Sequence, residues 1–473
     1  MLRLTATPPF KTIAALTVVS ASLITGTDSL AFEASGLGNN LVLAAHTEQT
    51  AQPALTAMSQ AEASYIFNSL LFLIGGFLVM FMAAGFAMLE AGLVRTKNVA
   101  DICLKNVALY ALAGLLFYLC GYNLMYLNVD GGYFGHLLLW MGDDSTLLSA
   151  SPDLTSTPYA SHSDWFFQMV FVATAASIVS GAVAERVRLI PFLLFVAILT
   201  GLIYPVTGSW KWGGGWLDVM GFQDFAGSTL VHSVGGWAAL TGVFFIGARK
   251  GRFRKDGAVQ AMPGSNLPLA TLGTFILWFG WFGFNGASQL AMGSAMDVSA
   301  IAKIFANTNM AAVGGVLSAM LISKARFGKF DLTMTLNGAL AGLVSITAEP
   351  LTPSLGQAIL IGAVGGMIVI YVVPFLDRLK IDDVVGAIPV HLACGIWGTL
   401  IVPATNNEAT FLNQLIGITS IGAFVIVASS IAWFVVNKIM TVRMGEEEEY
   451  LGGDQCELGL EAYPEFGHGS QKI

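Results

Sequence analysis

Long apolar stretches, separated by short polar turns, recur along most of this 473-residue chain. A helix needs roughly 17 to 25 predominantly apolar residues to cross the hydrocarbon layer of a membrane, and most of these stretches reach that length. The pattern therefore predicts eleven membrane-spanning helices. We place them at Ile66–Leu93, Ile102–Leu127, Trp165–Ala184, Leu189–Ser209, Phe225–Gly247, Leu267–Leu290, Ile304–Ser323, Leu332–Thr347, Ala358–Phe375, Val384–Val402 and Leu412–Val436.

The composition agrees with a membrane protein and argues against a water-soluble one. Hydrophobic residues make up 55% of the chain and charged residues only 11%, and no soluble domain of this length needs such an excess for its core. We therefore expect an all-α integral membrane fold that sits in a lipid bilayer.

Lysine and arginine residues follow the odd-numbered spans and almost never the even-numbered ones. After the odd-numbered spans come Arg95, Lys97, Lys105, Arg186, Arg188, Arg249, Lys250, Arg252, Arg254, Lys255, Lys324, Arg326, Lys329, Arg378, Lys380, Lys438, Arg443 and Lys472, whereas only Lys211 and Lys303 lie on the other side. Cytoplasmic loops collect basic residues. The pattern predicts a multi-pass protein with its amino terminus outside and its carboxyl terminus in the cytoplasm.

The first 45 residues are typical of a secretory signal peptide. Arg3 and Lys11 form a positive region, an apolar stretch follows, and small residues at Ser29–Ala31 offer a cleavage site, with Ala44–Ala45 as an alternative. An uncleaved leader is the other interpretation. Such a leader suggests the inner membrane of a Gram-negative type of bacterium, with residues 46–64 in the periplasm.

Two parts of the chain resemble each other. Asp224 precedes His232 by the same spacing that separates Asp383 from His391. Each histidine follows a valine and is followed by glycine and then tryptophan. Because five spans separate the copies, they cross the membrane in opposite senses, an inverted repeat whose transport site lies near the midplane. Chance agreement over so few positions is the alternative.

The repeat divides the chain into segments. These are a first five-helix repeat (65–248), a basic cytoplasmic loop (249–266), a second five-helix repeat (267–402), an outer loop with the eleventh helix (403–438) and a cytoplasmic tail (439–473).

His232 and His391 are the two histidines of six that fall within predicted spans. Ionisable side chains there are costly and usually face a cavity or a partner. At equivalent repeat positions, the two imidazoles can share one proton and line a narrow path. Two separate core histidines bonded to backbone carbonyls are the plainer alternative. A zinc pair is disfavoured because no third ligand accompanies them.

Several longer motifs, in order, are similar to those of the ammonium transporter family, which includes the Amt, MEP and Rhesus proteins. They are Gly85–Asn98 (GFAMLEAGLVRTKN), Gly181–Arg186 (GAVAER), Asp224–His232 (DFAGSTLVH), Trp281–Asn285 (WFGFN) and Val390–Gly395 (VHLACG). Glu90 in the first motif resembles the Amt branch more than the Rhesus branch.

This resemblance implies a set of site residues. Trp212, Phe171 and Ser288 resemble the family's outer recruitment site, where aromatic faces and a hydroxyl meet a cation. Phe171 and Phe284 resemble its stacked phenylalanine gate, with Phe167 and Gln168 as neighbouring wall residues, and His232 and His391 resemble its twin-histidine pore. For Asp224 we favour a structural role, capping the fifth span, with a weaker role in attracting cations. Trp212 as a membrane-interface residue and Ser288 as a helix cap are plainer alternatives.

The implied function is transport of ammonium or ammonia, one central pore per subunit, without cofactor, metal, enzymatic chemistry or nucleic acid. Family members are homotrimers that a PII-type signalling protein can close from the cytoplasm. The tail from Gly453 to Tyr463 resembles the family's coupling segment, although Leu458 replaces a frequent histidine, which leaves its fine contacts open.

Three other functions are weighed against transport of ammonium. One is an ammonium sensor in the same fold, which an appended signalling domain would favour, and another is a channel for a neutral solute such as carbon dioxide or water. The third is an intramembrane enzyme, for which the spans hold no convincing nucleophile, metal cluster or acid pair. The sequence leaves open whether ammonia, ammonium, or ammonia with a separately relayed proton crosses.

Overall fold

The computed structural model describes residues 58–145, 154 and 158–465. The predicted leader (1–45) lies outside these residues, as does most of the predicted periplasmic segment that follows it. Within the described part the regular structure is helical, and its β-type pairing is limited to two isolated bridges, Val187 with Arg443 and Phe253 with Val259. The expected all-α fold is confirmed.

The helices follow one another in a simple order. They are α1 (Gln60–Leu93), η1 (Thr96–Asn98), α2 (Val99–Leu116), η2 (Phe117–Gly121), α3 (Tyr122–Tyr126), α4 (Ser161–Val183), α5 (Leu189–Ile198), η4 (Leu199–Ile203), α6 (Tyr204–Ser209), α7 (Trp216–Val219), η5 (Ser228–Ser233), α8 (Val234–Ile246), α9 (Leu267–Ala287), α10 (Ala295–Phe327), α11 (Leu332–Ile346), α12 (Leu355–Arg378), η6 (Ile388–Ala393), α13 (Cys394–Leu400), η7 (Val402–Ala404), α14 (Phe411–Ile439), α15 (Glu446–Leu451) and η8 (Asp454–Leu458).

Each predicted span coincides with an apolar helical segment. Nine segments of the described chain are long and apolar enough to cross a membrane, and two shorter ones, Leu332–Ile346 and Ile388–Ala404, occupy the eighth and tenth predicted positions. Some helices extend past the apolar stretch. α1 begins at Gln60 rather than Ile66, because Ser59 caps it by accepting from the Glu62 amide. Because the first turn of such a helix is polar, hydrophobicity alone does not locate where the helix begins.

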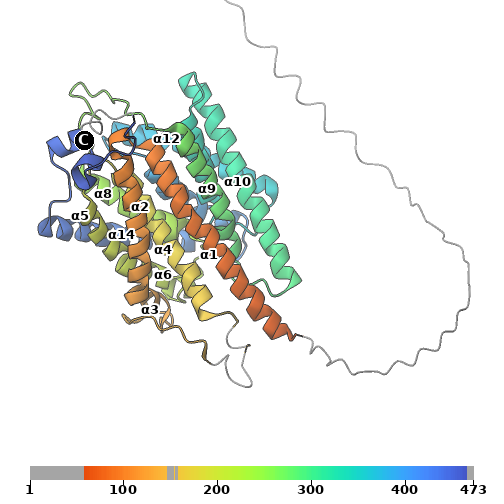
Figure 1. Cartoon of the computed structure of the whole chain (residues 1–473). Helices are drawn as coiled ribbons and strands as arrows, with labels where there is room; N and C mark the ends of the chain where they lie inside the picture. The colour runs from red at the N-terminus through yellow and green to blue at the C-terminus, as the bar shows by residue number, and fades with distance from the viewer. Residues whose placement is uncertain (1–57, 146–153, 155–157, 466–473) are drawn as a thin grey trace, which may run out of the picture. The chain divides into compact units, whose positions relative to one another are not determined.

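The first and sixth spans pack against each other in opposite directions. Gly75, near the middle of α1, lies against Ala287 at the end of α9, and Gly92, near the end of α1, lies against Ala270 near the start of α9. The two helices run side by side in Figure 1. Small residues allow this close contact between backbones. The antiparallel packing agrees with the inverted repeat.

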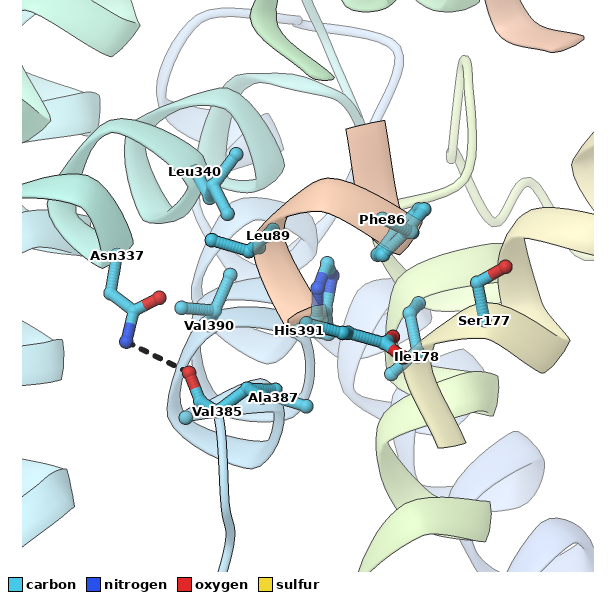
Figure 2. Close-up of a pocket in the computed structure, with 12 residues that line it drawn as sticks. Phe86, Leu89, Ser177, Ile178, Asn337, Leu340, Val385, Ala387, Val390 and His391 are labelled. Carbon is cyan, nitrogen blue, oxygen red and sulfur yellow. Dashed lines mark hydrogen bonds between the residues drawn. The ribbon is translucent and has the colours of Figure 1, made fainter. Parts of the chain in front are cut away.

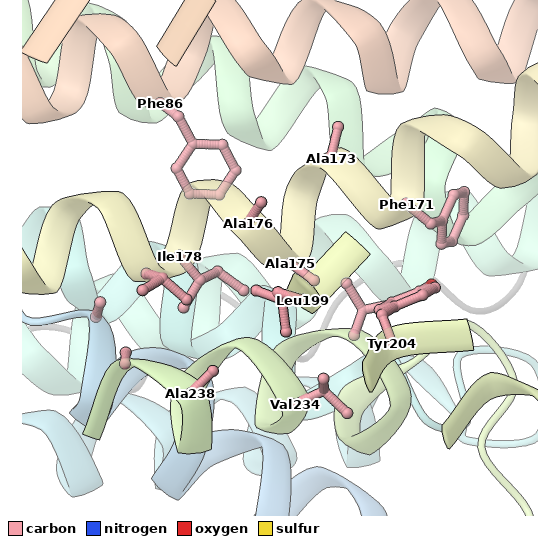
Figure 3. Packing of buried hydrophobic residues seen from close by; sticks show 14 of the residues in the cluster. Phe86, Phe171, Ala173, Ala175, Ala176, Ile178, Leu199, Tyr204, Val234 and Ala238 are labelled. Atoms are coloured by element: carbon pink, nitrogen blue, oxygen red, sulfur yellow. The ribbon is translucent and has the colours of Figure 1, made fainter. Parts of the chain in front are cut away.

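Helix α4 lies at the centre of the bundle, buried along almost its whole length from Met169 to Val183. Figure 3 shows its small side chains, including Ala173 and Ala176, among buried residues of neighbouring helices such as Val234 and Ala238 of α8. Alanines let α4 and α8 approach closely enough to hold the segment that carries His232.

A buried network of charges joins four loops, those after α1, α4, α8 and α12, at the end of the bundle that carries the tail, called here the tail end. Arg249 contacts Asp382 at 2.8 Å and Glu185 at 3.0 Å, Arg95 also contacts Glu185, and Arg186 donates to the Asp382 carbonyl. Burial raises the pKa of Asp382, but hydrogen bonds and charge from Arg249 outweigh it and hold that pKa below its usual range. The network ties the loop after α4 to those after α1, α8 and α12.

The tail docks on the start of α2. The Asp454 carboxylate accepts from the amides of Ala100 and Asp101, at 3.1 and 2.8 Å, and the Gly453 amide donates to Asn98. A carboxylate at a helix amino end is stabilised by the free amides and the helix dipole. Tail residues 452–454 are therefore held firmly against the bundle.

Candidate functional site

The two histidines that the repeat singles out meet inside the bundle. His232 lies in η5 and His391 in η6, both π-helical segments, and their Nδ1 atoms are 3.2 Å apart. Both side chains are buried. At this distance one proton lies between the two nitrogens, so one imidazole donates and the other accepts.

The same backbone construction positions each histidine. The Asp224 carboxylate accepts from the amides of Gly227, Thr229 and Leu230 at 2.8 to 3.1 Å, which is the capping role that the sequence analysis favoured. In the second copy Asp383 accepts from the amides of Gly386 and Ile388.

A glycine follows each capping aspartate by three residues. Gly227 has φ +107° and Gly386 φ +81°, a region that side chains disfavour. The repeated pattern Asp-x-x-Gly-x4-His therefore has a physical purpose, because the cap and the glycine turn the chain into the π-helical segment that carries the imidazole.

Aromatic rings continue from the histidines toward the opposite end of the bundle, called here the Trp212 end. Phe171 stacks on Phe284 with ring centroids 4.0 Å apart, and Phe284 lies 5.3 Å from His232. Trp281 also stacks on His232 at 4.9 Å, and its ring lies 5.8 Å from that of Phe284. The predicted gate phenylalanines are thus stacked on each other directly beside the histidine pair.

A cavity of about 340 Å³ lies beyond the phenylalanine stack. The three predicted recruitment residues, Phe171, Trp212 and Ser288, all line it, as do Phe167 and Gln168. The Trp212 ring meets Phe171 edge to face at 6.1 Å and donates from Nε1 to the Asp224 carbonyl. Ser288 donates to the Phe284 carbonyl, which leaves the hydroxyl oxygen free to accept.

A second, much smaller cavity lies on the other side of His391. Its volume is about 10 Å³, roughly enough for one water-sized molecule. Figure 2 shows Phe86, Ile178 and Val390 around His391, with the Asn337 amide donating to the Val385 carbonyl at 3.1 Å. The histidine pair therefore lies between a wide cavity and a narrow, mostly apolar one.

Glu90, a further residue of this site, was not among the residues predicted for it. Glu90 lines the small cavity, is buried, and accepts from Asn106 at 2.8 Å and Ser180 at 2.9 Å. An acid inside a predicted span was the available signal, but we used Glu90 only as a family marker.

The two cavities share an electrostatic property. No lysine or arginine is among the described residues that line either of them. Apolar and aromatic side chains line them instead, with one acid in each, Glu90 and Asp164, which suits a small cation or a neutral polar molecule and disfavours an anion.

The fold and this site define the class: a multi-pass membrane protein of the transporter kind, with a cavity on each side of a buried histidine pair. Residues 70–463 match the family model described as Ammonium Transporter Family. The chain belongs to the ammonium transporter family, whose members are transporters rather than enzymes.

Relatives and solved structures agree with this assignment. The chain is 42% identical to a putative ammonium transporter of Synechocystis, over 86% of this chain and 92% of that protein. It is 41% identical to the ammonium transporter Amt2 of Archaeoglobus fulgidus, over 83% of this chain and 87% of that protein. Among solved structures it is similar to a Sensor Amt Protein, with TM-score 0.76 and 34% identity over 83% of this chain and 98% of that one. It is also similar to the crystal structure of Candida albicans Mep2, with TM-score 0.71 and 26% identity over 82% of this chain and 89% of that one.

Proposed function

We propose that this protein takes up ammonium through a pore that passes between His232 and His391. The observation that carries the proposal is the contact between two buried imidazoles, one from each half of an inverted repeat. A passage between repeats is where a transported molecule meets both halves.

In the proposed sequence of events, ammonium first binds where Trp212, Phe171 and Ser288 line the larger cavity. Aromatic faces attract a cation by about 0.5 to 2 kcal/mol, more as it loses water, and the Ser288 oxygen accepts one N–H. The Phe171–Phe284 stack excludes hydrated ions, so the cation must lose its water, and a proton, to pass.

Beyond the stack, ammonia meets the histidine pair. His232 Nε2 is buried without a hydrogen-bond partner among the described residues, so it is available to the passing molecule. A proton taken from ammonium can move along the two coupled imidazoles while ammonia passes beside them. This arrangement favours ammonia with a separately relayed proton as the transported species.

The same proposal includes the setting of the protein. We expect a homotrimer in a bacterial inner membrane, with the Trp212 end outside and the tail in the cytoplasm, in agreement with the distribution of basic residues. A PII-type protein is the expected regulator at the tail end.

The transported species can be measured in vesicles that contain the purified protein and an internal pH dye. Ammonia alone alkalinises the interior without current, and ammonium alone carries current without early alkalinisation. Ammonia with a relayed proton also carries current. In that case the His232→Ala/His391→Ala variant loses the current but still lets ammonia permeate. Absence of both signals above empty vesicles would contradict transport.

A sensing role is the second candidate. It is favoured by the similarity to the structure titled Sensor Amt Protein and by the close docking of the tail on α2. A sensor would bind ammonium and change the exposure of its tail, measured by limited proteolysis, while vesicle flux stayed at the level of empty vesicles.

A further inference from the structure

The larger cavity extends past the predicted recruitment residues to a group of polar side chains that have no assigned role. Asp164 and three tyrosines, Tyr122, Tyr126 and Tyr159, line the far part of the same 340 Å³ space. They come from α3, α4 and the segment just before α4.

Asp164 is a buried acid without a basic partner. It is 7% exposed, and its carboxylate accepts from the Tyr122 hydroxyl and from Gln168 Nε2, the latter at 3.2 Å. In the described part of the chain, no lysine, arginine or histidine forms an ion pair with it. A buried carboxylate normally has such a partner.

Other buried acids of the structure are satisfied differently. Asp382 and Glu185 share Arg249, and Asp101 pairs with Lys105. Asp224 is held by backbone amides. Glu90 is also held by neutral side chains, Asn106 and Ser180, but it lines a cavity of only about 10 Å³. Asp164 instead lies at the wall of the wide cavity, where a mobile cation can supply the missing charge.

A second group in this part of the cavity also lacks a partner. The Tyr126 hydroxyl is buried and makes no hydrogen bond to any described residue, while its ring lies 5.1 Å from that of Tyr122. Tyr159, whose ring packs against Phe72 at 4.8 Å, adds an aromatic face. Together they bring a carboxylate, a buried hydroxyl without a partner among the described residues and π faces to the wall of one cavity.

We infer that the pocket formed by Asp164, Tyr126 and Tyr159 is a second ammonium site, which binds the cation before it reaches Trp212. Ammonium has four N–H donors, and the carboxylate and hydroxyl oxygens can accept two of them in charge-assisted hydrogen bonds. The inference rests on the proposed function, since it makes this pocket the entrance to the same pore.

The experiment measures the melting temperature of the purified full-length protein against ammonium chloride, with sodium chloride keeping ionic strength constant. Replacement of Asp164 by asparagine keeps the shape and removes the charge. We expect Asp164→Asn to raise the half-stabilising ammonium concentration about tenfold, as for loss of one charge-assisted hydrogen bond. Tyr126→Phe should raise it about threefold and provides the test if Asp164→Asn does not fold.

Two further variants separate this site from the Trp212 site and from general surface charge. Trp212→Leu should retain a saturable stabilisation by ammonium that disappears in Trp212→Leu/Asp164→Asn. Glu62→Gln, which removes an exposed acid in the first turn of α1, should leave the wild-type curve unchanged.

The outcomes distinguish this inference from the proposed function. Three results would overturn the second site. Asp164→Asn and Tyr126→Phe could both show the same melting-temperature curve against ammonium as the wild type, potassium chloride could stabilise the wild type as much as ammonium chloride, or ammonium could fail to stabilise the wild type. If vesicles with wild-type protein show no ammonium flux while the binding results hold, transport fails and the site stands. If flux is present with an unchanged half-saturating concentration in Asp164→Asn, only the site fails.

Discussion

The two copies of the repeat begin their histidine-bearing segments in the same way but in different surroundings. Asp224 caps η5 beside the Trp212 ring and lines an open cavity that Lys211 also lines. Asp383 caps η6 directly after Asp382, which binds Arg249 in a buried ionic network. The aspartate, the glycine and the histidine are common to both copies.

The common residues and the differing surroundings of the two copies have different roles in the structure. The common residues fix the backbone so that each half presents one imidazole at the centre. The residue before each cap differs, Gln223 in one copy and Asp382 in the other. The Gln223 backbone amide donates to the Gln414 side chain, and its carbonyl accepts from the same side chain, whereas Asp382 joins loops by charge. We conclude that the Trp212 end is built for selection and the tail end for cohesion.

The largest expected effect comes from breaking the tail-end network. Arg249→Met leaves Asp382 and Glu185 buried without their partner, and losing one member of a buried ion pair costs about 3 to 5 kcal/mol of unfolding free energy. We expect a clearly lower melting temperature in detergent. Lys255→Met, which changes an exposed residue of the same loop, is the control, and equal melting of the two variants would contradict cohesion by charge.

The network also predicts how stability depends on pH. Because the pKa of Asp382 is held below its usual range, its contribution is complete above the unfolded value of about 3.9 and is lost as pH falls through the folded value. The gap in melting temperature between wild type and Asp382→Asn should therefore be widest near neutral pH and narrow below about pH 4. A difference in melting temperature between the two proteins that widens as the pH falls would contradict this prediction.

Removing the two caps tests the common construction. Asp224→Ala and Asp383→Ala should each lower the unfolding free energy by about 1 to 2 kcal/mol, through loss of the accepting carboxylate. Only Asp224→Ala should also raise the half-saturating ammonium concentration, because Trp212 donates to the Asp224 backbone. A similar rise in Asp383→Ala would remove the distinction between the two ends.

The smallest effect is expected at the aromatic face. Trp212→Leu should raise the half-saturating ammonium concentration by roughly 2- to 30-fold, which corresponds to about 0.5 to 2 kcal/mol of cation–π attraction. Trp216→Leu is a matched control, since this indole packs on Trp210 and Tyr133 instead. Identical concentration curves for the two variants would remove Trp212 from the recruitment site.

Much of the fold could be predicted because the membrane imposes a simple pattern. Span Leu189–Ser209 was predicted with the bounds that the structure gives it. Helix starts in polar segments, such as Gln60, could not be predicted from hydrophobicity, because capping residues let a helix begin before the apolar stretch. The π-helical backbone around His232 and His391 also has no signature in hydrophobicity, since its cause is a cap and a glycine.

Candidate residues of the site could be named from the sequence where the repeat marked them, as at His232 and His391, or where the family resemblance suggested them, as at Trp212. Asp164 carried no such mark, because an acid close to the start of a predicted span resembles an ordinary helix cap. Its burial and its missing basic partner depend on Tyr122 and Gln168. Tyr122 lies in another helix, and no local pattern brings the two together.

The central claim, charge movement through the histidine pair, is tested most directly by the current that an ammonium pulse evokes in membranes with reconstituted protein. We predict an ammonium current that potassium does not evoke, that His162→Ala retains and that His232→Ala/His391→Ala loses. An equal, ammonium-selective current in the double variant would show that charge takes another path and would contradict the account.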